Sequence, residues 1–204
     1  MNIKAQNRRA LTLCAFDAML WTMKVLLHIC CAPCSIVSID RLREEGHELH
    51  GFWYNPNVQP WTENEKRREA VETYSTRVNL PMIWRNEYRL QEFLRMVAFR
   101  EAERCRLCYR MRLAAAANVA KRGKFDAFTT SLLYSKTQPH ELLAETAEAV
   151  GKEAGVPFLY RDFRPGWQEG IVRSKQEGLY RQQYCGCIYS EKERYVGGKA
   201  GREG

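Results

Sequence analysis

The sequence lacks any hydrophobic run of the roughly 18 consecutive apolar residues that a membrane-spanning helix requires. The best candidate, residues 11–20, is interrupted by Asp17. We also expect no secretory signal, because no small-residue cleavage site follows the Arg8-Arg9 pair and its apolar stretch before a strand-like segment begins at Lys24. These absences predict a cytoplasmic protein with no membrane partner.

Internal repeats and low-complexity blocks are also missing. A chain of 204 residues with 45% hydrophobic content can build one compact domain but not two. We expect a single catalytic domain over residues 23–192, with residues 1–22 an extension outside it and Met23 a candidate alternative start. Residues 193–204 end in a Gly-rich stretch with little apolar surface, which predicts a disordered tail.

Cysteine is the residue type in excess, with eight in the chain. The cysteines are clustered rather than spread out as in a disulfide framework, which indicates a reducing compartment. Apart from Cys14, they form three groups far apart in the sequence: Cys30, Cys31 and Cys34; Cys105 and Cys108; Cys185 and Cys187.

Hydrophobic patterning predicts strands that alternate with helices. Strands are expected at residues 24–29, 48–54, 81–84, 125–131 and 157–160. Helices are expected at residues 35–46, 62–78, 89–98, 105–122 and 139–154. Thr62 followed by Glu65 predicts a capping box at the start of the second helix. This alternation predicts a three-layer α/β fold, a mainly parallel sheet with helices on both faces, plus a helical segment that carries the second cysteine pair.

In an open parallel sheet, binding sites gather beyond the carboxyl ends of the strands. The thiol loop at residues 30–34 follows the first strand, and residues 129–131 end a later one. Cys34 and Ser35 precede a predicted helix, whose free N–H groups favour a thiolate or an anionic cluster. The cysteines are therefore expected at the edge where such a fold binds its ligands.

Two C-x-x-C pairs, Cys31/Cys34 and Cys105/Cys108, supply the four thiolates of a structural zinc site. Compact zinc ribbons separate such pairs by roughly 15–20 residues, whereas about 70 lie between them here. Zinc also gives no reason for the adjacency of Cys30 and Cys31. A redox metallocluster needs four thiolates and benefits from further thiols nearby. The pattern favours an iron–sulfur cluster and leaves zinc and free or catalytic thiols open.

The third pair, Cys185 and Cys187, flanks Gly186, which removes the side chain that would crowd a bridge between residues only two apart. Strained, accessible disulfides have the less negative potentials of catalytic or regulatory couples. The pair is therefore a candidate redox-active disulfide, with two further metal ligands as the alternative.

Together, six segments resemble the QueH-type epoxyqueuosine reductases in spacing and order, over about Met23 to Lys192. They are HICCAPC, WYNPN, RCRLCYRMRL, FTTSLLYSKTQPHE, DFR and YRQQYCGCIYS. The resemblance implies a nucleotide-binding-like α/β fold. It also implies the reduction of epoxyqueuosine to queuosine in tRNA without cobalamin, the last step of queuosine biosynthesis.

The resemblance also implies a cofactor. Matched by position, the ligands of a 4Fe–4S cluster are Cys30, Cys31, Cys105 and Cys108. It implies a redox-active catalytic role for Cys185 and Cys187, and leaves room for a separate mononuclear iron with Cys34 and Asp162 as candidate contacts.

Removing an epoxide oxygen to leave an alkene consumes two electrons and two protons and releases water. A cluster that passes one electron at a time then needs a partner, either the cysteine pair or an adjacent metal. Residues able by type to donate protons, each of which also fits ordinary packing, are His28, Tyr134, Tyr184 and Asp162.

The expected partner is the tRNA anticodon stem-loop that carries epoxyqueuosine; the electron donor is unknown. A net charge of +8 fits an anionic partner. Candidates for stacking on unpaired bases are Trp53, Tyr54, Trp61 and Trp84. Candidates for phosphate contacts are Lys66, Arg67, Arg68, Arg104, Arg106, Arg110 and Arg112.

Two other classes stay open: a metal-free thiol oxidoreductase and a zinc-stabilised RNA-binding module. An adenylating enzyme would share the fold class, but CCAPCS occupies the place where its SGG-x-D-S loop would follow the first strand. We therefore expect no ATP requirement.

Overall fold

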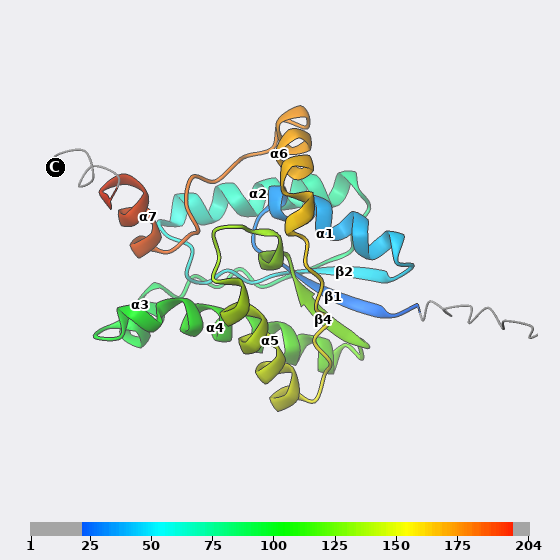
Figure 1. Cartoon of the computed structure of the whole chain (residues 1–204), viewed down its shortest axis with the longest axis horizontal. Helices are drawn as coiled ribbons and strands as arrows, with labels where there is room; N and C mark the ends of the chain where they lie inside the picture. The colour runs from blue at the N-terminus through cyan, green and yellow to red at the C-terminus, as the bar shows by residue number, and fades with distance from the viewer. Residues whose placement is uncertain (1–21, 198–204) are drawn as a thin grey trace, which may run out of the picture.

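The computed structural model describes residues 22–197. Its centre is one four-stranded sheet in the order β3-β2-β1-β4, in which every neighbouring pair is parallel (Figure 1). The strands are β1 Lys24–Ile29, β2 Glu48–Trp53, β3 Met82–Trp84 and β4 Ala127–Thr130. Since parallel strands need crossover connections, helices follow the strands, as the sequence predicts.

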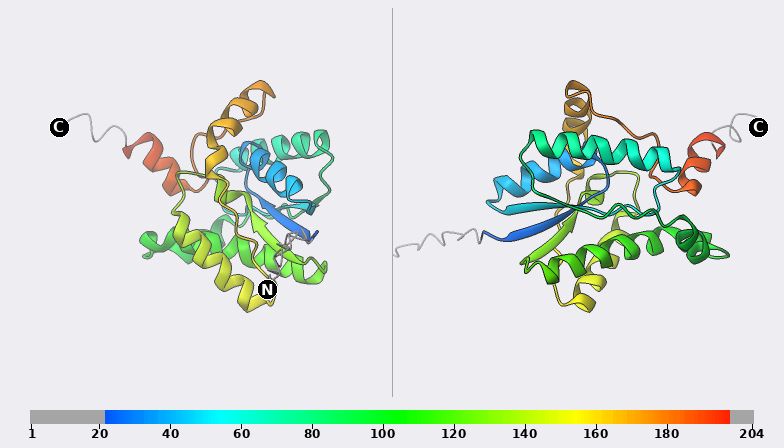
Figure 2. Two further views of the ribbon diagram at one scale, coloured as in Figure 1. Left: turned by 45° about the vertical axis from the view of Figure 1, so that its right-hand side comes forward. Right: turned by 180° about the vertical axis from the view of Figure 1, so that it is seen from behind.

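Within residues 22–197, seven α-helices surround the sheet. They are α1 Ala32–Glu44, α2 Trp61–Arg77, α3 Leu90–Val97, α4 Arg104–Arg122, α5 His140–Ala154, α6 Trp167–Gln176 and α7 Ile188–Tyr195. The two further views show α1 and α2 on one face and α4 and α5 on the other (Figure 2). The predicted three-layer α/β architecture is confirmed.

Strand β1 forms the middle of the sheet because it is mostly apolar, apart from Lys24 and His28, and is buried from Val25 onward. It pairs with β2 on one side and with β4 on the other, so that His28 lies between Phe52 and Thr130. In β2, a Cβ at Gly51 would lie 2.2 Å from the sulfur of Met82. A side chain at this position would therefore displace Met82 and press on Ile29 and Leu80.

Three details of the predicted elements are wrong. Helix α2 begins at Trp61 with Pro60 as its N-cap and no side-chain cap, so Thr62 and Glu65 form no capping box. The expected strand 157–160 is reduced to one bridge between Phe128 and Phe158, because the chain there makes only two hydrogen bonds with β4. Strand β4 ends at Thr130, where the chain turns into a 3₁₀ helix.

The C-terminal part of the chain is more regular than the sequence predicts. Helices α6 and α7 were not expected, and the predicted domain boundary at Lys192 falls inside α7. The predicted extension 1–22 lies outside the described residues except for Thr22, and so do Cys14 and the end of the predicted tail from 198 onward. Within residues 22–197, no helix is both long enough and apolar enough to cross a membrane.

Candidate active site

The first cysteine group lies at the carboxyl end of β1, where the chain enters α1. Cys31 is the N-cap of α1, and its Sγ accepts a hydrogen bond of 3.3 Å from the backbone N of Cys34. The helix therefore begins at Ala32 rather than at Ser35, because proline is well tolerated in a first turn and Pro33 occupies it. Cys34 lies inside the helix, not before it as the sequence predicts.

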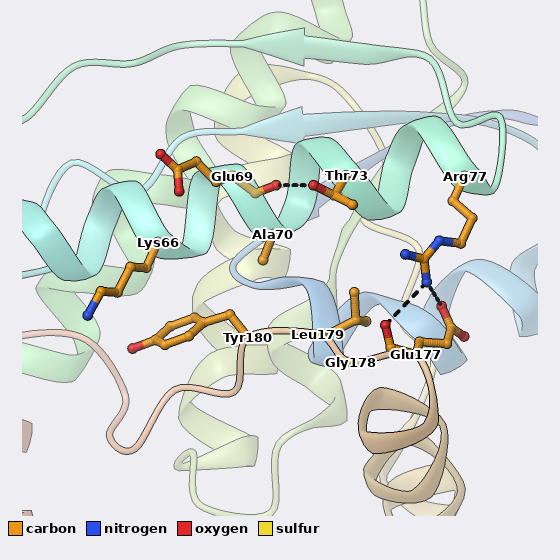
Figure 3. Close-up of a pocket in the computed structure, with 9 residues that line it drawn as sticks. All are labelled: Lys66, Glu69, Ala70, Thr73, Arg77, Glu177, Gly178, Leu179 and Tyr180. Carbon is orange, nitrogen blue, oxygen red and sulfur yellow. Dashed lines mark hydrogen bonds and ion pairs between the residues drawn. The ribbon is translucent and has the colours of Figure 1, made fainter.

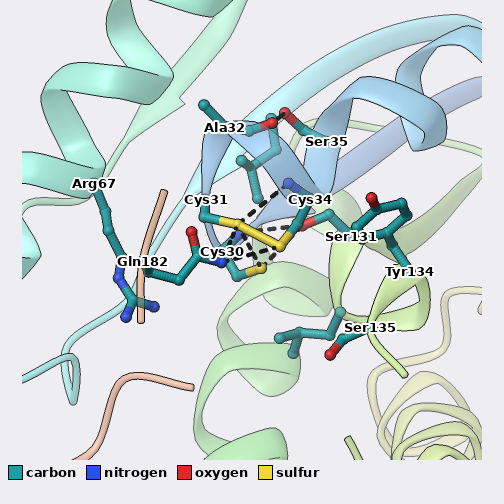
Figure 4. Close-up of a disulfide and its surroundings, with 12 residues drawn as sticks. Cys30, Cys31, Ala32, Cys34, Ser35, Arg67, Ser131, Tyr134, Ser135 and Gln182 are labelled. Atoms are coloured by element: carbon teal, nitrogen blue, oxygen red, sulfur yellow. Dashed lines mark hydrogen bonds between the residues drawn. A yellow bond between two sulfur atoms is a disulfide. The ribbon is translucent and has the colours of Figure 1, made fainter. Parts of the chain in front are cut away.

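Three sulfurs meet in this turn (Figure 4). Those of Cys30, Cys31 and Cys34 all lie within 4.8 Å of one another and are buried. Cys31 and Cys34, with Cα atoms 5.4 Å apart, form a disulfide in this structure. This distance suits a bridge. Once the bridge is reduced, the group could bind a metal.

Two side chains from distant segments donate to these sulfurs. The Ser131 hydroxyl donates to the Sγ of Cys30 at 3.4 Å. Gln182 donates from Nε2 to the Sγ of Cys31 at 2.9 Å and to that of Cys34 at 3.4 Å. Sequence reasoning missed Gln182. The only signal for it was its position three residues before Cys185, in the YRQQYCGC segment.

The second cysteine pair lies on the first turns of α4. Cys108 is buried and accepts a hydrogen bond of 3.1 Å from Asn57 Nδ2. The other end of that amide, Asn57 Oδ1, accepts from Nε of Arg112 at 2.9 Å. Arg112 is only 1% exposed. Burial raises the pKa of the Cys108 thiol to about 11, against the opposing effect of the Arg112 charge.

Electrostatics connects the three cysteine groups. The Arg112 charge acts on Cys30 as well as on Cys108, and in both it offsets part of the rise in thiol pKa that burial causes. The charge of Cys185, in contrast, raises the thiol pKa of Cys30, Cys105 and Cys108. The Arg112 charge therefore acts on thiols of more than one group. Among the described residues, the sulfurs that lie within 4.8 Å of one another are those of Cys30, Cys31 and Cys34, and this group does not include Cys105 or Cys108.

The third pair does not form the predicted disulfide. Cys185 and Cys187 are both free, and Cys185 is exposed. The Sγ of Cys185 accepts a hydrogen bond of 3.0 Å from Gln138 Nε2. Tyr109 donates to the other end of this amide, Oε1, at 2.5 Å. This hydrogen bond orients the NH₂ group of Gln138 toward the sulfur.

The segment that carries Cys185 is held on α2 by Arg67. This guanidinium donates from NH1 to the carbonyl of Cys185 at 2.8 Å and from NH2 to that of Tyr184 at 2.9 Å. Its Nε donates to Glu63 at 2.7 Å, and the side chain is 1% exposed. The prediction that Arg67 and Arg112 contact phosphate is wrong, because both are buried. The other five predicted phosphate contacts are partly or fully exposed.

A cavity of about 570 Å³ connects the first and third cysteine groups. Cys30, Cys34 and Cys185 all line it. On one wall, Tyr134 stacks on Trp167 with ring centroids 5.1 Å apart. Residues 181–185 and α7 supply another wall, which includes the charged side chains Arg181, Glu193 and Arg194. Ligand pockets for small molecules are typically of this size.

The predicted proton donors separate into two kinds. His28 is fully buried between the carbonyl of Tyr54 and the hydroxyl of Thr130, and burial lowers its pKa to about 3. His28 is thus a neutral, hydrogen-bonded core residue, which is the packing alternative that the sequence left open, and it is not a suitable proton donor. Tyr134 and Tyr184 line the cavity, and burial raises the pKa of each to about 12, so both keep their protons at neutral pH.

Asp162 does not lie in the cavity wall. Its carboxylate accepts hydrogen bonds of 2.8 and 2.7 Å from the guanidinium of Arg164, which lower its pKa. The carboxylate is therefore ionised and paired with Arg164, and it has no proton to donate at neutral pH.

Most of the predicted stacking residues serve the core. Trp53 and Tyr54 are buried, Trp84 packs against Trp53 with ring centroids 6.3 Å apart, and only Trp61 is well exposed, at 46%. The aromatic wall of the cavity uses Trp167 instead, which sequence reasoning missed because it lies in the unpredicted helix α6.

A second cavity, of about 430 Å³, lies between α2 and the segment that follows α6 (Figure 3). An ion pair of 3.1 Å between Arg77 and Glu177 closes one end of it. Its walls contain no cysteine or histidine. It therefore offers neither the thiols nor the aromatic pair of the first cavity.

The fold has a relative among solved structures. The predicted subunit of a tRNA methyltransferase from Methanocaldococcus jannaschii superposes with a TM-score of 0.54 over 75% of this chain and 74% of that one, at 10% sequence identity. At this identity the likeness concerns the fold alone.

Sequence comparisons are more specific. The family model described as epoxyqueuosine reductase QueH matches residues 25–193. The QueH protein of Dehalococcoides mccartyi is 39% identical over 172 residues, which cover 84% of this chain and 94% of that protein. The QueH protein of Thermotoga maritima is 34% identical over 180 residues, which cover 83% and 91%. The chain belongs to the QueH family of epoxyqueuosine reductases.

Proposed function

We propose that this protein reduces epoxyqueuosine to queuosine in tRNA without cobalamin, as the last step of queuosine biosynthesis. One observation carries the proposal: thiols from two distant segments, Cys30 and Cys34 on one side and Cys185 on the other, line a single cavity of about 570 Å³. A space of this size accommodates one nucleoside. Membership of the QueH family supports the same reaction.

The cofactor of this reaction is, in our proposal, a 4Fe–4S cluster with the four ligands expected from the sequence, Cys30, Cys31, Cys105 and Cys108. The chemistry of the donor set fits such a group, because all four residues are sulfur donors and Cys30, Cys31 and Cys108 are buried. Cys30 and Cys31 lie in the three-sulfur group with Cys34, and the approach of Cys105 and Cys108 to them when the cluster binds is part of the proposal. Reduction of the Cys31–Cys34 bridge would free the thiolate of Cys31. When bound, the cluster supplies electrons one at a time.

The proposal keeps a separate iron beside the cluster, with Cys34 as its candidate contact and without Asp162. The Sγ of Cys34 lies in the same group as those of Cys30 and Cys31, which supports Cys34 as a ligand. Asp162 is bonded to Arg164 away from the cavity wall, so we withdraw it as a contact.

Cys185 and Cys187 are the proposed two-electron partner. Oxidation of both thiols to one disulfide releases two electrons and two protons. Opening the epoxide and expelling its oxygen as water consumes the same number of each, and leaves the alkene. An external reductant must then restore the two thiols.

The remaining residues of the cavity bind the substrate in this proposal. Tyr134 and Trp167 present an aromatic wall on which the modified base stacks, and Arg181 and Arg194 lie where they can hold phosphates. Tyr134 and Tyr184 keep their protons at neutral pH, so each can donate a proton to the substrate and take one back from the two that the thiols release. The cytoplasm, where thiols stay reduced, is the expected compartment.

The test is anaerobic purification with iron, sulfide and zinc analysis, followed by reduction of epoxyqueuosine-containing tRNA with dithionite and without ATP. We expect about four irons and four sulfides per chain and conversion to queuosine. A colourless, active protein would support the thiol oxidoreductase instead, and bound zinc without turnover would support the RNA-binding module. Strict dependence on ATP would refute the assignment.

A further inference from the structure

Phe99 is the most exposed large apolar side chain among residues 22–197, at 98%. It lies in the short link between α3 and the 3₁₀ helix Glu101–Glu103. Its backbone has φ of +59°, a left-handed conformation that bulky residues rarely adopt. Glycine or asparagine would fit this backbone better. The Phe99 ring also gains no free energy from burial, because it is exposed. Neither conformation nor packing therefore explains a phenylalanine at this position.

Two arginines lie near the ring in the sequence, Arg100 directly after it and Arg95 four residues before it. Arg95 and Arg100 are both exposed, and neither forms an ion pair with any residue of the described chain. The nearby carboxylates are engaged elsewhere, since Glu101 accepts from the backbone N of Phe99 at 3.1 Å and Glu103 pairs with Arg106 at 3.1 Å. The end of α3 and the link after it, residues 95–100, which we call the tip, thus present an exposed aromatic ring and two positive charges.

This tip is connected to the rim of the first cavity. Arg104 donates to the carbonyl of Glu101 at 3.3 Å and pairs with Glu193 of α7, and Glu193 lines the cavity. Figures 1 and 2 show α3 and α7 at the same end of the molecule in every view. An RNA whose modified nucleotide occupies the cavity would therefore extend past α7 toward this tip.

We propose that Phe99, Arg95 and Arg100 form a second contact surface for RNA, on which an unpaired base outside the cavity stacks on the ring while the arginines hold phosphates. Stacking on an exposed aromatic, with arginine on the backbone, is the usual mode of binding single-stranded nucleic acid. The surface rests on the proposed tRNA substrate and adds a site that no residue of the cavity supplies.

The test measures binding apart from catalysis, by the fluorescence anisotropy of a labelled anticodon stem-loop. Phe99→Gly should weaken binding about 5- to 100-fold, the range for one lost stack. Its melting temperature should stay the same or rise, because glycine relieves the left-handed backbone. Phe99→Leu should weaken binding nearly as much, whereas Phe99→Trp should retain it. Arg100→Gln should lower the salt dependence of binding by about one counterion.

The matched control is Val172→Ala on α6, which also trims an exposed apolar side chain, 43% exposed, and should leave binding unchanged. Unchanged binding by Phe99→Gly, or leucine as effective as phenylalanine, would overturn the surface. A lower melting temperature of Phe99→Gly would instead give the ring a structural role and equally overturn it. If binding responds as expected but epoxyqueuosine is not reduced, the surface stands and the proposed reaction fails.

Discussion

The first and third cysteine groups are held in contrasting ways. Residues 30–34 continue a buried central strand into a helix, so the main chain itself fixes the sulfurs through the parallel ladder and the N-cap of Cys31. Residues 181–187 belong to no helix or strand. They are held by individual side chains and single backbone hydrogen bonds rather than by a strand ladder. The main ones are the buried Arg67 and a hydrogen bond of 2.7 Å between Gln59 N and the Gly186 carbonyl, with Gln138 and Gln182 adding their bonds to sulfur.

This contrast indicates which part of the site can move. Segments that depend on few contacts open locally at lower free energy than a core strand does. In the proposed reaction the first group would hold a cofactor in place, while the third would be oxidised and would meet an external reductant. An irregular, partly exposed segment suits the second task.

The largest expected effect comes from removing either a proposed cluster ligand or a cysteine of the third group. Cys105→Ala should abolish retention of the cluster, with iron and sulfide falling to background, because one of four ligands is lost. Cys187→Ala should keep the colour and iron content but lose turnover. Elemental analysis and absorption spectra of anaerobic samples check both results. Loss of iron from Cys187→Ala would place that thiol among the ligands.

The second prediction concerns the attachment of the third group. Arg67→Met removes the ion-pair partner of the buried Glu63, which still accepts from the Tyr180 hydroxyl, and it also frees two carbonyls. We therefore expect a loss of about 3–5 kcal/mol in the free energy of unfolding. The matched control is Arg68→Gln, one residue on, whose pairs with Glu65 and Glu72 lie at the surface and contribute about 0–1 kcal/mol.

Urea denaturation measures both variants, and hydrogen exchange of residues 181–187 shows where the effect lies. Faster exchange confined to this segment in Arg67→Met would sharpen the comparison. Equal stability of the two variants would mean that Arg67 does not hold the segment.

The smallest expected effect concerns His28, which lies in β1 two residues before Cys30. Since its pKa is lowered from 6.5 to about 3, the unfolded chain takes up the proton first as pH falls. His28 therefore contributes stability that is complete above pH 6.5 and is lost toward pH 3, amounting to about 2 kcal/mol by pH 5.

The measurement compares denaturation of the wild type and His28→Gln at pH 7 and pH 5. The variant should be less stable at pH 7 but should lose about 2 kcal/mol less on acidification. Between pH 7 and 8 both proteins should respond alike, which serves as the control. Parallel losses in the two proteins at pH 5 would show that His28 is not the group responsible.

Much of the fold was predictable because its signals are local. The apolar run of β1, the glycine that ends α4 and the turn residues after β2 each act within a few residues. The failures are equally specific. Thr62 and Glu65 make a capping-box pattern, but the chain enters α2 from Pro60. The segment that begins at Pro157 has the composition of a strand, but it pairs with β4 at only one bridge, between Phe128 and Phe158.

The candidate site was predictable in its chemistry but not in its assembly. All seven described cysteines were expected to matter, and the resemblance to QueH reductases, with its expected function, is confirmed by the family match. Two residues expected to contact phosphate, Arg67 and Arg112, are buried instead. A buried guanidinium and an exposed one look the same in sequence, because their difference depends on which distant groups accept their hydrogen bonds.

By itself, the sequence determined the order of the elements, the parallel sheet and the presence of three thiol groups, since these depend on residue type and spacing. Only the tertiary structure decided that Cys30, Cys34 and Cys185 share one cavity, that Gln138 and Gln182 donate to sulfur, and that Phe99 stands free. These facts depend on contacts between residues up to about 150 positions apart, and no local pattern records them.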